Sequence, residues 1–181
     1  MLKRFVKRLL SCLLLAALFV LVVIGGTLGV QGWRLYRATA AQKPIAGLYD
    51  EISSRPGFAS CDQLPQTYID AVISVEDSRF ERHHGIDPAA IVRALWADLR
   101  TRSLAEGGST LTQQLIKNTV FNGGMETSKG SKIERKIQEQ YLALQLTKNV
   151  DRKVILTNYL NTINLGSNTL GVKAAALRYF N

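Results

Sequence analysis

Cysteine and histidine are scarce in this sequence of 181 residues, which has two of each. Cys12 lies inside an apolar run and Cys61 lies far outside it, so the two cannot pair within one chain. His83 and His84 are neighbours, and neither has a further ligand at metal-binding spacing. These absences exclude a disulfide framework and a cysteine metal site, and they argue against a zinc site.

Charged residues are absent from Leu9 to Val30, where nearly every position is Leu, Val, Ala, Ile, Phe or Gly. A helix needs about 20 such residues to cross a hydrocarbon core of about 30 Å. Trp33 and Tyr36 follow the run, and four basic residues precede it: Lys3, Arg4, Lys7 and Arg8. These flanks predict a membrane-spanning helix whose N-terminus is cytoplasmic and whose remaining chain lies outside.

A cleaved signal peptide is the alternative interpretation, because Ala38-Thr39-Ala40 has the small-x-small pattern of a cleavage site. Signal-peptide cores are typically about 7–15 apolar residues, and this tripeptide lies well beyond the end of the run. We therefore expect a retained anchor over residues 9–30, behind a basic tail at residues 1–8.

The net charge of the chain is +9, and the basic tail supplies only part of it. The remainder lies on the predicted outer part. There we expect acidic partners such as phospholipid headgroups, diphosphates or anionic polymers. Nucleic acid, the common partner of a basic chain, is not expected outside the cell.

Helical patterns dominate the rest of the chain, which shows no strand alternation of any length and no internal repeat. Residues 31–63 are expected to form a connector, because from Ala38 onward they contain Pro44, Pro56 and several Gly and Ser. Breaks such as Gly107-Gly108 and residues 122–132 separate five predicted helices: 65–80, 88–101, 109–120, 133–146 and 152–163. Residues 64–181 are therefore expected to form one mainly α domain.

An acidic residue continues the apolar stripe of the first predicted helix. Ile69, Val72 and Ile73 lie at helical spacing. The next position on that stripe is Glu76, and Phe80 follows one turn later. A carboxylate on a buried stripe is desolvated, which raises its pKa and makes it a candidate general acid or base. An ordinary Glu at a helix end, paired with a neighbouring cation, is the favoured interpretation on spacing alone.

Gly107-Gly108 precedes a predicted helix start, where Thr110 and Gln113 have capping-box spacing. Backbone N–H groups at a helix start attract anions, and the hydroxyls of Ser109 and Thr110 add donors. One polar stripe follows on this helix: Thr110, Gln113, Gln114 and Lys117. A solvated face explains such a stripe, but the Gly-Gly-Ser-Thr opening favours a phosphate-bearing ligand.

Glu139 begins a second apolar stripe, which continues through Leu142, Ala143 and Leu146. Arg135 lies four residues before Glu139 on the same face. A buried Glu–Arg pair and a catalytic carboxylate explain this spacing equally well. Two carboxylates on separate helices suit chemistry at a glycosidic or phosphate ester carbon. His83 is expected to orient the loop that holds Glu76.

Taken in order, these segments resemble five motifs of the peptidoglycan glycosyltransferase domain of class A penicillin-binding proteins. The first motif contains Glu76, Asp77, Phe80, His83 and Gly85. The second runs from Gly107 to Asn118 as Gly-Gly-Ser-Thr-Leu-Thr-Gln-Gln-Leu-Ile-Lys-Asn. The others are Arg135-Lys136 with Glu139, Ile155–Asn161 with Gly166, and Gly171–Phe180. Five motifs in this order behind one apolar run make the resemblance very specific.

The resemblance implies a mainly α, lysozyme-like fold and two substrates, lipid II and the growing glycan strand. It implies that Glu76 is the general base that removes the proton from the acceptor 4-hydroxyl. This hydroxyl attacks the donor's anomeric carbon with inversion, and undecaprenyl diphosphate leaves. Lys117, Ser109 and Arg135 would hold the diphosphate charge, and Glu139 would assist there.

The resemblance also implies the surroundings of the site. No cofactor is required, although a divalent ion such as Mg²⁺ or Mn²⁺ near Glu139 is compatible with the family. Membrane lipids and proteins of a cell-wall synthesis complex are the implied partners, and nucleic acid is not one. The implied substrate-binding residues are Asp77, Phe80, His83, Gly85, Gly108, Ser109, Thr110, Thr112, Gln113, Gln114, Lys117, Asn118, Arg135, Lys136 and Asn161.

The sequence departs from the family pattern near the third and fourth motifs. Ser131 stands where the family commonly has Arg, and the following Thr is Lys132. The linker before the third motif is longer than usual, so Lys129 or Lys132 is expected to supply the missing charge. Thr157 stands where the family has Glu, which we expect to be a minor structural change.

Family members continue past the fifth motif with further helices and often with a transpeptidase domain. The sequence therefore resembles the N-terminal part of a longer protein, with a truncated glycosyltransferase domain. An inactive fragment or anchor is the main alternative function. A lytic, lysozyme-like enzyme is the second alternative, and the Gly-Gly-Ser-Thr segment beside basic residues argues against it.

Overall fold

The structure is a computed structural model that describes residues 2–42, 44, 47–101, 107–125 and 128–181. Within these ranges every regular element is a helix, apart from one isolated β-bridge between Asn164 and Leu170. The mainly α class is therefore confirmed. The side chains of Lys3 and Lys129, and parts of the predicted connector and of the break at 122–132, lie outside the described residues.

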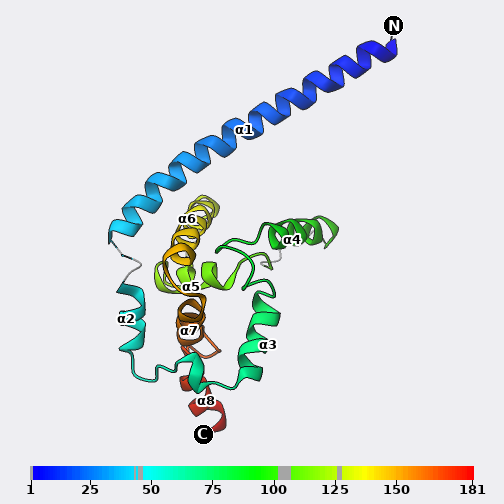
Figure 1. Cartoon of the computed structure of the whole chain (residues 1–181). Helices are drawn as coiled ribbons and strands as arrows, with labels where there is room; N and C mark the ends of the chain where they lie inside the picture. The colour runs from blue at the N-terminus through cyan, green and yellow to red at the C-terminus, as the bar shows by residue number, and fades with distance from the viewer. Residues whose placement is uncertain (1, 43, 45–46, 102–106, 126–127) are drawn as a thin grey trace.

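Eight α-helices and a short 3-10 helix follow one another along the described chain. Figure 1 shows the first as a long rod that projects away from the others, with the last at the opposite end of the molecule. They are α1 (Leu2–Gln42), α2 (Leu48–Ser53), η2 (Cys61–Gln63), α3 (Gln66–Glu76), α4 (Pro88–Thr101), α5 (Leu111–Thr119), α6 (Lys129–Asn149), α7 (Arg152–Thr162) and α8 (Val172–Phe180).

The apolar helix α1 is longer than the run that predicted it. Its segment Arg4–Gln42 is long and apolar enough to cross a membrane. Residues 31–42 were expected to begin the connector, but they are helical because no proline interrupts them and because Gly32 packs closely against α6. The helix α2 also lies inside the predicted connector and buries Ile52 in the core.

The ends of the predicted helices follow their capping residues. α4 coincides with the predicted range 88–101, because Asp87 accepts hydrogen bonds from the backbone N–H groups of Ala89 and Ala90. Pro88 suits the first helical position, where no N–H partner is needed. α6 begins earlier than predicted because the hydroxyl of Ser128 accepts a hydrogen bond from the N–H of Ser131.

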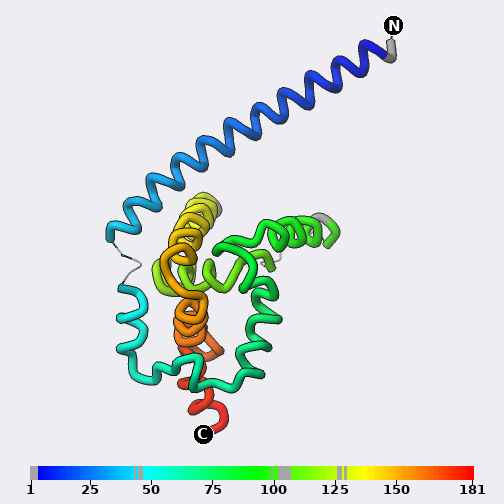
Figure 2. The backbone as a smooth tube through the Cα atoms, viewed as in Figure 1, coloured from blue at the N-terminus to red at the C-terminus, as the bar shows by residue number. Residues whose placement is uncertain are grey.

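The hydrophobic core lies between α5, α6 and α7. Every residue of α7 from Ile155 to Thr162 is buried. Leu111 and Leu115 of α5 and Leu142 of α6 are fully enclosed against it. Figure 2 shows the tube of α5 crossing between α6 and α7 near the middle of the molecule, with α2 and α3 on either side. The apolar stripe of α6 that was predicted after Glu139, formed by Leu142, Ala143 and Leu146, thus points inward as expected.

Candidate active site

Glu76 is the last residue of α3, and it is exposed. The helix ends there because Asp77 leaves the helical conformation, with φ −158° and ψ 70°. Of the two interpretations of its spacing, the structure therefore contains the glutamate at a helix end, and it contains no desolvated carboxylate at this position. In α3, all of which the structure describes, Ile69 is the one buried residue. The side-chain amide of Gln114 on α5 donates to Oε2 of Glu76 at 3.0 Å, so the carboxylate is oriented while it faces solvent.

Asp77 is buried and connects the chain after Glu76 to the start of α5. Nε2 of His83 lies 2.9 and 2.8 Å from its two oxygens, and the N–H of Leu111 donates to Oδ2 at 3.0 Å. The N–H of Gly85 donates to Nδ1 of His83 at 3.1 Å. A ring nitrogen that accepts carries no proton, so Nε2 carries it and donates to Asp77. His83 orients this loop, as the sequence predicted.

Gly85 brings the same loop against the backbone of α6. Its φ is +93°, and a Cβ there would lie 2.4 Å from the carbonyl oxygen of Ala143. The hydroxyl of Thr110 donates to the Gly85 carbonyl at 2.7 Å and accepts from the N–H of Gln113 at 3.2 Å. Thr110 and Gln113 are thus buried in the predicted capping box, and they hold the fold instead of facing a ligand.

Arg152, the first residue of α7, binds the loop between α3 and α4. No sequence pattern singled it out. Its guanidinium donates to the carbonyl oxygens of Phe80 and His83 and lies 5.8 Å from the centroid of the Phe80 ring. Phe80, predicted to bind substrate, is 1% exposed and belongs to the core. No local pattern links an arginine at a helix start to a loop so much earlier in the chain.

A hollow of about 160 Å³ opens beside Glu76. Residues from α3, the following loop, α4 and the segment before α5 line it, among them Glu76, Asp77, Asp87, Arg93 and Ser109. Arg93 is exposed on α4, and no motif singled it out. The hollow therefore combines an accessible carboxylate, a cation and a hydroxyl. The carboxylate can take a proton from an attacking group, and the cation and the hydroxyl can stabilise the charge of a leaving group.

Glu139 is 0% exposed and has two cations beside it on its own helix. Nη1 of Arg135 donates to Oε1, and Nζ of Lys136 lies 3.0 Å from Oε2. Nζ of Lys136 also donates to the hydroxyl of Ser109 at 2.6 Å. Of the two interpretations of the spacing, the buried ion pair is the one that the structure contains. Lys136 and Ser109 join this pair to the edge of the hollow.

A divalent ion does not fit at Glu139. Both carboxylate oxygens are already bonded to Arg135 and Lys136, whose positive charges repel a metal ion. In the part of the chain that the structure describes, no group of three His, Cys, Asp or Glu side chains could hold one. We therefore assign no step to a metal at this position.

The remaining predicted residues divide between the site and the core. Gly108 borders a second hollow, of about 240 Å³, together with Ser109 and Lys136. Thr112 is buried in α5, and Lys117 and Asn118 are half-buried there.

Asn161 is buried outside the hollow. Its side chain exchanges hydrogen bonds of 2.7 and 2.9 Å with the backbone of Ala59, so it fixes the connector to α7.

The departures from the family pattern lie in structural positions. Ser131 stands in the first turn of α6, where its hydroxyl donates to the Ser128 carbonyl at 3.0 Å. Lys132 is exposed in the same turn. The hydroxyl of Thr157 donates to the Lys153 carbonyl at 2.8 Å and lies 3.0 Å from the sulfur of Cys61. Thr157 thus packs α7 against η2. This contact agrees with the expectation that Thr in place of Glu is a structural change.

Comparison with known proteins places these observations in a family. A transglycosylase family model matches residues 43–181. Penicillin-binding protein 1A of Clostridium novyi is 47% identical over 124 residues, which are 66% of this chain and 14% of that protein. Its namesake from Aquifex aeolicus is 39% identical over 152 residues, 83% of this chain and 20% of that protein. Penicillin-binding protein 1A/1B of Bacillus subtilis is 36% identical over 145 residues, 80% of this chain and 15% of that protein.

The chain thus spans a fifth or less of the length of these relatives, and the match falls on the part that carries the site. The family model covers the loop after α3, the start of α5 and the ion pair of α6 without interruption. The resemblance of the five motifs is confirmed, and the chain belongs to the transglycosylase family.

Proposed function

We propose that the chain is a peptidoglycan glycosyltransferase that polymerises lipid II into glycan strands and releases undecaprenyl diphosphate. The observation that carries this proposal is the exposed carboxylate of Glu76, oriented by Gln114 at the edge of a hollow that also contains Arg93 and Ser109. Membership of the transglycosylase family supports glycosyl transfer as the reaction class.

Glu76 acts as the general base. Because it is exposed at the edge of the hollow, it can come within hydrogen-bond reach of a bound substrate hydroxyl. Gln114 bonds to Oε2, and we assign the other oxygen to the 4-hydroxyl of the acceptor lipid II. As that hydroxyl attacks the anomeric carbon of the donor strand, its proton passes to Glu76. The bond from that carbon to the diphosphate oxygen breaks with inversion.

The departing diphosphate gains negative charge, which nearby cations and donors stabilise. Lys136 suits this role better than Arg135, because its side chain is 44% exposed whereas that of Arg135 is 11% exposed. Ser109, already bonded to Lys136, supplies a hydroxyl, and Arg93 supplies a second cation in the hollow. Lys117 keeps the diphosphate role that its motif implies. Glu139 fixes Arg135 and Lys136 in place.

The apolar helix α1 anchors the enzyme in the membrane, with its basic N-terminus in the cytoplasm and the site outside. A polyprenyl substrate lies in that same membrane, so an anchored enzyme meets it at the surface. The partners are lipid II, the growing strand, membrane lipids and other proteins of cell-wall synthesis.

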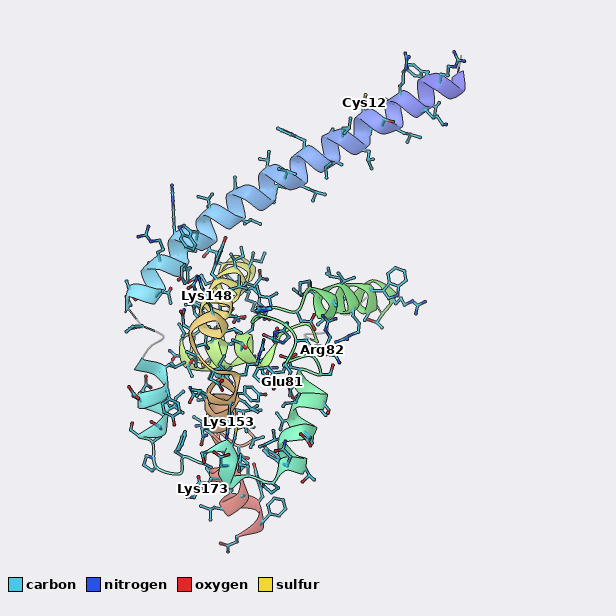
Figure 3. All side chains as sticks on the ribbon, viewed as in Figure 1. Cys12, Glu81, Arg82, Lys148, Lys153 and Lys173 are labelled. Carbon is cyan, nitrogen blue, oxygen red and sulfur yellow. The ribbon has the colours of Figure 1, made fainter. Side chains whose placement is uncertain are left out.

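The test is polymerisation of lipid II by the full chain in detergent. We expect glycan strands from the parent and a rate about 10²–10⁴-fold lower for Glu76→Gln, because general acid–base catalysis contributes about that factor. Glu81→Gln is the matched control, since Glu81 is an exposed carboxylate in the same loop, labelled in Figure 3. Equal rates for the parent and Glu76→Gln would overturn the assignment.

The same assay separates the alternative functions. A parent chain without product, under conditions in which a full-length relative makes glycan, would support an inactive fragment. Release of soluble sugars from finished peptidoglycan would instead support a lytic enzyme.

A further inference from the structure

α6 lies between the core and α1, and we propose that α1 does more than tether the domain. It is a wall of the catalytic domain, in which Gly32 lets α6 approach α1 closely and so acts as a positioning residue for Lys136 and Glu139. The part of this inference that concerns catalysis rests on the proposed function. We call the contact of Gly29, Gly32 and Thr39 with Ile137, Gln138 and Tyr141 the seam.

The two helices of the seam approach closely at Gly32. This glycine is buried, and a Cβ on it would lie 2.0 Å from Cγ2 of Ile137 and 3.4 Å from the ring of Tyr141. The hydroxyl of Tyr141 donates to the carbonyl of Gly29 at 3.3 Å. Because real side-chain atoms essentially never pack at 2.0 Å, a larger residue at position 32 must turn Ile137 out of its position or move α1 and α6 apart. A β-branched residue has one strongly preferred rotamer in a helix, which favours movement of the helices.

Further contacts extend the seam along α1. The rings of Trp33 and Tyr36 are 5.1 Å apart, and each lies within 6 Å of the Tyr141 ring, at 5.6 and 5.8 Å. The hydroxyl of Thr39 donates to the side-chain oxygen of Gln138 at 2.8 Å. Along α1, the seam extends from Gly29 to Thr39, which is about 15 Å at 1.5 Å per residue. A contact of this length fixes both the separation and the register of the two helices.

Ile137 and Tyr141 lie on the face of α6 opposite Glu139. Ile137 and Tyr141 are each two residues from Glu139, which corresponds to about 200° around a helix. Glu139 is enclosed by the core while Ile137 and Tyr141 contact α1. A displacement of α6 away from α1 therefore moves Lys136 and Glu139 toward α5 and Ser109. A misplacement of about 1 Å can lower a rate by about 10²-fold.

The experiment compares alanine substitutions on two faces of α1 in the full chain in detergent. Gly32→Ala is the test, and Gly26→Ala is the control, because a Cβ at Gly26 meets nothing within 4 Å. The rescue is Gly32→Ala combined with Ile137→Ala, which removes the Cγ2 atom and leaves a Cβ contact at 3.1 Å. We expect Gly32→Ala to lower kcat by about 10–100-fold with little change in KM.

Amide hydrogen exchange of residues 129–149 supplies a readout that does not need activity. We expect faster exchange in α6 for Gly32→Ala, parental exchange for Gly26→Ala, and recovery of both exchange and kcat in the double variant. Parental kcat and exchange in Gly32→Ala would overturn the inference, as would equal losses in Gly26→Ala. A parent chain without polymerase activity would overturn the proposed function alone, and exchange would still test the seam.

Discussion

Glu76 and Glu139 both lie on the apolar stripe of a helix, yet α3 ends at the first whereas α6 continues past the second to Asn149. Glu76 is exposed and has the amide of Gln114 beside it. Glu139 is enclosed, with Arg135 and Lys136 on its two oxygens. A stripe position therefore tells which face a carboxylate lies on, while the end of the helix decides whether the core covers it.

This difference in exposure gives the two glutamates different roles. A carboxylate at a helix end can meet a substrate hydroxyl, and its removal leaves no buried charge behind. An enclosed carboxylate bonded to two cations holds them in place, and its removal takes a buried negative charge away from both. Stability measurements on variants of both residues and their neighbours test this separation directly.

The largest effect is expected for Glu139→Ala. Arg135, whose side chain is 11% exposed, would lose the buried carboxylate bonded to it, so the free energy of unfolding should fall by about 3–5 kcal/mol. Chemical denaturation of the full chain, followed by circular dichroism, measures this loss. Glu134→Ala, at an exposed position of the same helix, is the control. Equal stability of the two variants would contradict the structural role of Glu139.

A smaller loss is expected for Asp77→Asn, beside the exposed carboxylate. The amide oxygen at the place of Oδ2 can still accept from the N–H of Leu111 and from His83, but the NH₂ group then lies at the place of Oδ1, 2.9 Å from the Nε2 donor of His83. The free energy of unfolding should fall by about 1–3 kcal/mol, the cost of leaving a buried donor unpaired. Denaturation under the same conditions measures it, and a variant as stable as the parent would show that His83 does not depend on Asp77.

Tyr159 offers a pH-dependent comparison. Burial raises its pKa above the usual 10.0, and the negative charge of Glu76 raises that pKa further. The folded chain therefore keeps a proton that the unfolded chain loses above about pH 10, so stability falls as the pH rises past that value. Tyr159→Phe should flatten this fall between pH 9 and 11, although it loses the hydroxyl's bond to Gln114, worth about 0.5–1.5 kcal/mol. Parallel melting curves against pH would contradict the prediction.

The smallest effect on stability is expected for Glu76→Gln. The residue is exposed, and a glutamine can still accept the hydrogen bond from Gln114, so the free energy of unfolding should change by less than about 0.5 kcal/mol. A melting temperature equal to that of the parent, in a variant without polymerase activity, completes the contrast with Glu139. A loss of unfolding free energy as large as that of Glu139→Ala would show that both carboxylates stabilise the fold.

The position of a helix could be predicted from the sequence where a capping residue stands at the start of a segment with helical periodicity. Asp87-Pro88 gave the start of α4, and the Thr110–Gln113 box gave the start of α5. The early start of α6 and the continuation of α1 to Gln42 depend on a cap and on packing between the two helices. α8 was not among the predicted helices, and most of its nine side chains are exposed.

The motif residues of the site could be located from the sequence, but their burial could not. Glu76 and Glu139 have the same pattern around them, and only the tertiary structure distinguishes them. Arg93 and Arg152 lie far along the chain from the residues that they accompany, so no local spacing indicates them. Phe80 and Asn161 belong to motifs for a different reason than substrate contact, because the first fills the core and the second fixes the connector.

Side chains from three parts of the chain hold the loop between α3 and α4. His83 and Asp77 close it on one side, Thr110 holds Gly85, and Arg152 binds two of its carbonyl groups. Fixing the backbone of one residue costs about 1–2 kcal/mol of conformational entropy. Folding meets that entropic cost once for the whole loop, so in the proposed reaction the acceptor hydroxyl meets a Glu76 that is already held in place.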